Sequence, residues 1–186
     1  MTAMMTRQRI SVAEYEAMGE DQVLAPDLRT ELLDGEVFEM PPIGPSHASL
    51  VSRIENTLKL LYRHRGISWV QNPVFLDQWS MPQPDVAFLK PRDDYYASPR
   101  PTPADILLLV EVSDTTLRLD RGKKLALYAA AGVPLVWIVN VRTRRLLVFE
   151  GPVGGGYTTE AEFGSGDSVE VPGLSLPVAV TELIGE

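Results

Sequence analysis

Ile106-Leu107-Leu108-Leu109-Val110-Glu111-Val112-Ser113 is the segment that decides the fold, an apolar run that carries a single carboxylate near its end. Unbroken apolar residues over this length are typical of a strand that is covered on both faces. Glu111 in such a strand loses its hydration, and a paired charge or a bound cation must offset that cost. The sequence therefore predicts a charged partner for Glu111.

The nearest candidate partner is Asp85, which stands before a second apolar run in Pro84-Asp85-Val86-Ala87-Phe88. Two carboxylates on neighbouring buried strands repel each other unless a hard cation such as Mg²⁺ lies between them. The chain has no cysteine and two histidines, which excludes thiolate sites and argues against a His-rich zinc site. We therefore predict a divalent-metal site built from oxygen ligands.

Composition is that of an ordinary globular protein, with 186 residues, 45% of them hydrophobic and 23% charged. This length predicts a single domain over residues 1–186. We find no stretch long enough to span a membrane and no apolar core of a signal peptide in residues 1–9, so we expect a cytoplasmic protein. The net charge of −8 argues against a surface that coats nucleic acids, although Arg and Lys cluster locally at 118–124 and 142–145.

The remaining pattern predicts an α/β fold, in which a mixed β-sheet is flanked by helices and extended by extra edge strands. Helices are expected at 11–18, 46–63 and 123–131, with N-caps at Ser11, Ser46 and Asp120 and a stop at Gly132. Asp34-Gly35 predicts a hairpin over 30–40. Strands are expected at 68–76, 85–89, 106–112, 135–139, 144–150, 157–159 and 168–171.

Acidic, basic and aromatic residues form one pattern along the centre of the chain: Pro84-Asp85, Glu111-Val112-Ser113, Asp120, Lys124, Tyr128, Gly132-Val133-Pro134 and Trp137-Ile138-Val139. Together with Glu31, Gly35, Met40 and His47 upstream, this pattern resembles the Uma family of putative restriction endonucleases, which belongs to the PD-(D/E)XK nuclease superfamily. The likeness runs from Ser11 to about Glu150 and is specific as a set.

The resemblance implies a restriction-endonuclease-like core in which Asp85, Glu111 and the backbone carbonyl of Val112 hold Mg²⁺ or Mn²⁺. It also implies an endonuclease that hydrolyses DNA phosphodiester bonds, in which Glu31 orients the attacking water or helps to hold a second metal. A bound metal lowers the pKa of water and neutralises charge on phosphate oxygens, and a nearby ammonium assists the nucleophile.

Position 113 departs from the superfamily pattern, because Ser113 stands where the superfamily has lysine. The resemblance implies that Lys124, on the following helix, supplies the ammonium instead. Steps of four residues place Asp120, Lys124 and Tyr128 on one helix face, which can point at the two acids.

Each of these residues also has an ordinary structural explanation. Asp85 would only begin a strand, and Glu111 would pair with a buried arginine. Lys124 would be a solvated helix lysine, and Glu31 a surface residue. The sequence does not decide the roles of His47, a polar residue in a first helical turn, and of Tyr128, whose hydroxyl would otherwise find a partner at the helix surface.

Two other functions stay open at this point. The net negative charge and Ser113 are also consistent with a non-catalytic nuclease-fold module that binds protein or nucleic acid. A metal phosphoesterase acting on a small or RNA substrate would use the same chemistry, since such a site selects phosphate but not its carrier. For an enzyme that cuts both strands of DNA, a homodimer is the expected assembly.

Overall fold

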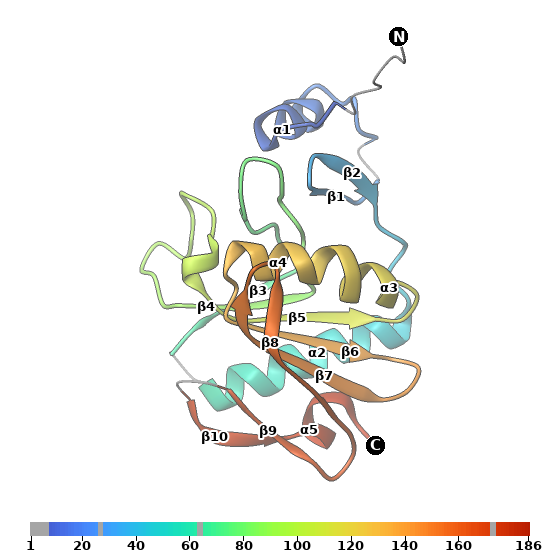
Figure 1. The fold of residues 1–186 in the computed structure, drawn as a ribbon, viewed down its shortest axis with the longest axis vertical. Coiled ribbons are helices and arrows are strands. Elements are labelled where there is room, and N and C mark those ends of the chain that lie inside the picture. Colours follow the sequence, from blue (N-terminus) through green and yellow to red (C-terminus); the bar gives the residue numbers. More distant parts are fainter. Residues whose placement is uncertain (1–7, 26–27, 63–64, 172–173) are drawn as a thin grey trace.

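The computed structural model describes residues 8–25, 28–62, 65–171 and 174–186 (Figure 1). Within these ranges, six strands form a central sheet in the order β3-β4-β5-β6-β7-β8. Only β5 and β6 pair in parallel among them, so the sheet is mixed, as predicted. The strands are β3 (Ile67–Val70), β4 (Val86–Leu89), β5 (Ile106–Ser113), β6 (Leu135–Asn140), β7 (Arg145–Val153) and β8 (Gly156–Phe163).

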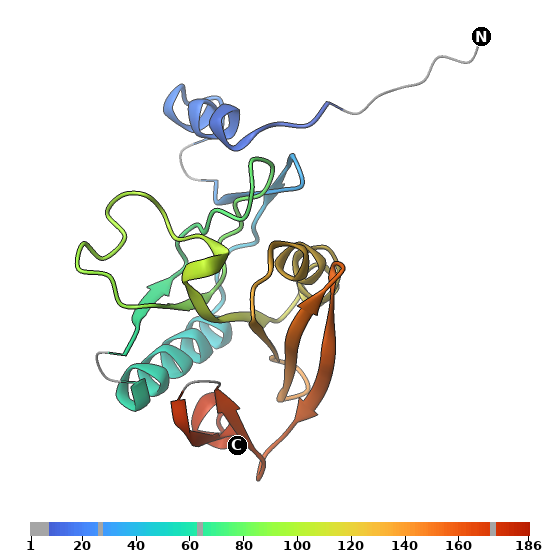
Figure 2. The same ribbon diagram turned by 60° about the vertical axis from the view of Figure 1, so that its left-hand side comes forward.

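Helices cover both faces of the central sheet, and Figures 1 and 2 show α2 (Pro45–Tyr62) and α4 (Leu125–Ala131) on opposite sides of it. Side chains alternate between the two faces of a strand, so each β5 residue belongs to one layer or the other. Leu108 packs in the cluster that contains Ile54 of α2, whereas Leu109 packs in the cluster that contains Tyr128 of α4. The predicted two-sided burial of the central strands is confirmed.

The helix that faces the site is longer than predicted. It consists of α3 (Leu117–Leu119), a π-helical turn η2 (Asp120–Lys124) and α4, and these run on without a break. Asp120 is therefore not an N-cap, because it lies inside the helix and its carboxylate accepts hydrogen bonds from side chains before the helix. Gly132 ends the helix as predicted, with a φ of 81° that glycine adopts at little cost.

The N-terminal elements follow the prediction closely. Ser11 and Glu14 form a capping box at the start of α1 (Val12–Glu20). Strands β1 (Thr30–Leu33) and β2 (Glu36–Glu39) form a hairpin whose turn residues, Asp34 and Gly35, have φ values of 56° and 75°. Two positive φ values suit the twist of a two-residue hairpin loop.

Several predicted boundaries are wrong; β7 and β8, for example, run past the predicted ends at 150 and 159. Helix α2 begins at Pro45 and not at Ser46, because proline lacks an N–H and suits a first helical position; the predicted end at Arg63 lies outside the described residues. The predicted strand at 68–76 is cut to β3, since Gln71 takes a φ of 51° and Pro73 cannot donate to a ladder.

Of the predicted extra strands, β7 and β8 extend the edge of the central sheet as expected, but the strand at 168–171 does not. β9 (Ser168–Val171) pairs instead with β10 (Leu174–Ala179) in a separate two-stranded sheet, followed by α5 (Val180–Ile184). Val180 and Leu183 are buried in the same cluster as α2, so this unit covers the α2 side of the core. None of the described helices has the length and apolarity needed to cross a bilayer.

Candidate active site

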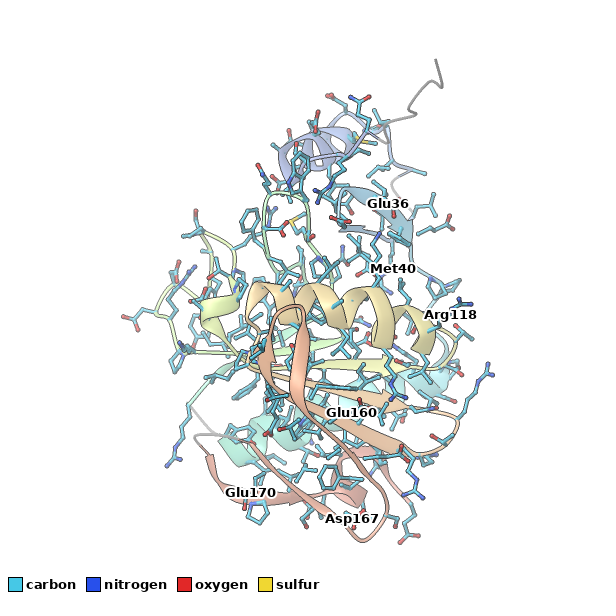
Figure 3. All side chains as sticks on the ribbon, viewed as in Figure 1. Glu36, Met40, Arg118, Glu160, Asp167 and Glu170 are labelled. Carbon is cyan, nitrogen blue, oxygen red and sulfur yellow. The ribbon has the colours of Figure 1, made fainter. Side chains whose placement is uncertain are left out.

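The two acids singled out in the sequence meet at one end of the central sheet. Val86 of β4 pairs with Val110 of β5, so the next residues of these antiparallel strands, Asp85 and Glu111, are cross-strand neighbours. Both side chains line one cavity of about 290 Å³. The loop after the β1–β2 hairpin forms its rim, and Figure 3 shows Met40 between that hairpin and the α3–α4 helix.

Lys124 lies at the centre of this group and is only 2% exposed. Its Nζ is 2.9 Å from Oε1 of Glu111 and 3.2 Å from Oε2 of Glu31. Oδ1 of Asp120 is further away, at 3.9 Å. Burial alone would lower the pKa of Lys124, but the negative charges of these three carboxylates outweigh it and raise that pKa above the ordinary value. The side chain is thus a buried ammonium and not a solvated helix lysine.

Glu111 receives two donors on the same oxygen. Its Oε1 accepts a hydrogen bond of 2.5 Å from the Tyr128 hydroxyl and also contacts Lys124. Burial raises the pKa of Glu111 well above its usual range, and the Lys124 charge opposes that shift. Burial likewise raises the pKa of Tyr128, so its hydroxyl stays protonated and donates. Of the contacts found among the described residues, none uses Oε2 of Glu111.

Asp85 is held by donors from three different segments. Its Oδ2 accepts the Val112 N–H at 2.8 Å and lies 3.1 Å from Nε2 of His47, at the start of α2. Its Oδ1 accepts a hydrogen bond of 3.3 Å from Nε2 of Gln71. The hydrogen bond with Asp85 raises the pKa of His47, against the effect of burial. Nδ1 of His47 is buried and has no hydrogen-bond partner among the described residues.

Glu31 is buried, which excludes the surface explanation. Strand β1 directs it toward Lys124, and its Oε2 also accepts the Gln83 N–H at 3.2 Å. The hairpin thus adds a third carboxylate to the group that Lys124 contacts. The structure therefore brings together all four residues that the sequence analysis proposed as catalytic, Asp85, Glu111, Lys124 and Glu31, around one cavity.

Ser113, the position at which the resemblance led us to note a missing lysine, contacts Asp120. Its hydroxyl donates to Oδ2 of Asp120 at 2.7 Å, and the Thr116 hydroxyl donates to the same oxygen at 2.6 Å. Sequence reasoning missed Thr116, although its spacing of four residues from Asp120 was a usable signal. It also missed Gln71 and Gln83, which come from irregular segments where no periodicity marks them.

The donor set can be tested against the predicted Mg²⁺ or Mn²⁺. Among the described residues, no three His, Cys, Asp or Glu side chains converge as a group that could hold an ion. The predicted set needs only two such side chains, because a backbone carbonyl is its third protein ligand. Asp85, Glu111 and Val112 line the same cavity. The described contacts of the Glu111 carboxylate with Tyr128 and Lys124 both use Oε1, so Oε2 is available to an ion. Hard oxygen donors of this kind fit either cation.

Comparison with known proteins places the chain in a family. The family model Uma2, described as "Putative restriction endonuclease", matches residues 12–179. A crystal structure of a putative nuclease from Anabaena variabilis has the same fold, with a TM-score of 0.72 and 13% sequence identity over 94% of this chain and 97% of that chain. No curated protein matches the sequence. The family match covers most of the chain, and the chain therefore belongs to the Uma2 family of putative restriction endonucleases.

Proposed function

We propose that the protein is a Mg²⁺- or Mn²⁺-dependent endonuclease that hydrolyses DNA phosphodiester bonds. The observation that carries the proposal is the buried contact of Lys124 with Glu111 at 2.9 Å, beside Asp85 in one cavity. Acids and an ammonium buried together are costly for stability, and such groups are concentrated at functional sites. Family membership supports a nuclease in general terms.

Asp85, Glu111 and the Val112 carbonyl would hold the metal ion. The bound ion would supply positive charge to the phosphate and lower the pKa of a water molecule. Asp85 is already oriented for this by Val112 and Gln71, whose hydrogen bonds fix both of its oxygens. Preorganised ligands of this kind need little rearrangement when the ion arrives.

Lys124, on the helix, and Glu31, on β1, would act on the reacting groups. The Lys124 ammonium is placed to stabilise negative charge that develops on the phosphate oxygens. Glu31, 3.2 Å from the same ammonium, is placed to accept a proton from the attacking water or to orient it. Six acids line the cavity, against the basic residues Arg29, His47 and Lys124, so a bound cation would favour the entry of a phosphate.

Nicking of supercoiled plasmid DNA tests the proposal. The wild-type protein should nick in Mg²⁺ or Mn²⁺ and not in a chelator, and Asp85→Ala and Glu111→Ala should abolish nicking. Glu39→Gln is the matched control, because Glu39 lines the same cavity but is exposed and contacts none of the four catalytic candidates in the contacts described. Equal nicking by the wild type and both alanine variants would remove the proposal.

A homodimer is part of the same proposal. Cutting both strands of a duplex usually takes two active sites, and cyclic pairs are the commonest assemblies. Analytical ultracentrifugation should show a dimer in the presence of DNA and Ca²⁺. Ca²⁺ replaces Mg²⁺ in this experiment so that the DNA is bound but not cut. A strict monomer that still makes double-strand breaks would contradict this part.

A further inference from the structure

We propose that Tyr128 is a positioning residue for the metal site, which fixes the Glu111 carboxylate so that its free oxygen faces the cation. The inference rests on the proposed function. Its basis is the 2.5 Å hydrogen bond from the Tyr128 hydroxyl to Oε1 of Glu111, between two side chains that are both almost completely buried.

Two donors from one helix converge on a single carboxylate oxygen. Lys124 and Tyr128 are four residues apart, so both project from the same helix face toward β5. Both contact Oε1 of Glu111, and none of the contacts described for this part of the chain involves Oε2. The last torsion of a glutamate side chain is intrinsically broad, so a carboxylate needs such contacts to hold one orientation.

Lys124 alone would not give the same fixation. Its ammonium lies between three carboxylates, with Oε2 of Glu31 at 3.2 Å and Oδ1 of Asp120 at 3.9 Å, so its attraction is shared. The Tyr128 hydroxyl, in contrast, has its one described hydrogen bond with Glu111. A rigid aromatic ring packed in the α4-side cluster also holds the hydroxyl in place.

Core packing does not explain the hydroxyl of Tyr128, because phenylalanine would fill the same apolar space. Tyr62 shows the difference within this chain. Its ring is buried in the α2-side cluster, yet its hydroxyl has no hydrogen-bond partner among the described residues. A hydroxyl aimed at a charged acceptor makes a stronger bond than one between neutral groups, so Tyr128 acts on Glu111 in a way that Tyr62 does not act on any acid.

Calorimetric titration with Mn²⁺ tests the inference on the full-length protein. Tyr128→Phe keeps the ring and removes only the hydroxyl, and Tyr62→Phe is the matched control. Loss of an outer hydrogen bond to a metal ligand typically weakens metal affinity about 10- to 100-fold. We expect Tyr128→Phe to raise the Kd for Mn²⁺ by that factor and Tyr62→Phe to leave it unchanged. Circular dichroism establishes that each variant is folded.

A double-mutant cycle separates positioning from a general effect on stability. In a Glu111→Gln background the metal ligand is already impaired, so adding Tyr128→Phe should change the remaining Mn²⁺ affinity by much less than it does in the wild type. A purely structural role would give the same change in both backgrounds. That result would overturn the inference even if Tyr128→Phe were less stable.

The outcomes distinguish this inference from the proposed function. If the wild type binds Mn²⁺ and nicks DNA, but Tyr128→Phe binds Mn²⁺ as tightly, only the role of Tyr128 is wrong. If the wild type takes up no Mn²⁺ and does not nick, both the nuclease proposal and the role of Tyr128 are overturned.

Discussion

Nζ of Lys124 lies 2.9 Å from Oε1 of Glu111, although the lysine belongs to a helix and the acid to a strand. Lys124 is the last residue of the π-helical turn η2, a kind of turn that is rare and frequent at functional sites. Ser113, on the same strand as Glu111, does not supply a charge and instead holds Asp120. The ammonium thus reaches the acids from the helix and not from the strand that carries Glu111.

Removing the Lys124 charge should destabilise the protein. Lys124→Met leaves Glu111 and Glu31 without their buried counter-ion, and breaking a buried pair by removing one partner costs about 3–5 kcal/mol. Lys123→Met is the neighbouring control, because Lys123 pairs with Glu36 in a partly exposed position and such pairs contribute about 0–1 kcal/mol. Urea denaturation without metal measures both. Equal unfolding free energies for the two variants would refute the electrostatic account.

Glu31 should affect the rate of nicking more than the fold. Glu31→Gln keeps the size of the side chain but removes the proposed base, and loss of a positioned general base lowers rates about 10²- to 10⁴-fold. The initial nicking rate at saturating Mn²⁺ measures this, with Glu39→Gln as the control on the cavity rim. If Glu31→Gln and Glu39→Gln nick at the same rate, Glu31 has no role in the chemistry.

Ser113 and Thr116 should act as a unit. Both hydroxyls donate to Oδ2 of Asp120, and a typical hydrogen bond contributes about 0.5–1.5 kcal/mol. Ser113→Ala and Thr116→Val should each cost about that much. The double variant should cost more than their sum, because Asp120 then loses both hydroxyl donors while it stays buried. Additivity within about 0.3 kcal/mol would show that the two hydroxyls are independent.

The α2 side of the core should be sensitive to cavities. Ile54 is buried between α2 and the sheet, and truncation of such a residue to alanine costs about 2–5 kcal/mol. Leu60, on the same helix, is 65% exposed, so Leu60→Ala should change stability by less than about 0.5 kcal/mol. Thermal and urea denaturation of the two variants check the orientation of α2. A larger loss for Leu60→Ala would mean that the helix presents another face.

Much of the sheet could be predicted because the apolar residues of each strand indicate that the strand is buried. Leu135 to Val139 is apolar throughout and lies in the middle of the sheet, and Asp34-Gly35 has the backbone angles that a tight hairpin requires. The sequence of a strand does not show which other strand it pairs with. The sequence of β9 does not show that it pairs with β10 and not with the edge of the central sheet, since pairing depends on what the rest of the core leaves uncovered.

In the candidate site, too, some residues could be predicted from the sequence and others could not. Asp85, Glu111, Lys124 and Tyr128 stand out by their types in apolar surroundings or by helical spacing, and the structure places all four around one cavity or against its walls. Gln71 and Gln83 hold two of the acids from irregular segments, where geometry and not periodicity fixes their positions. The prediction of Asp120 as an N-cap failed because the helix already begins at Leu117, so Asp120 lies inside it.

The proposed nuclease depends on a divalent cation that lies between Asp85 and Glu111. A crystal soaked with Mn²⁺ and measured for anomalous scattering tests it most directly. We predict a single strong peak within ligand distance of Oε2 of Glu111 and of an Asp85 oxygen, with Lys124 still on Oε1. A map at saturating Mn²⁺ with no peak between these two carboxylates would contradict the account.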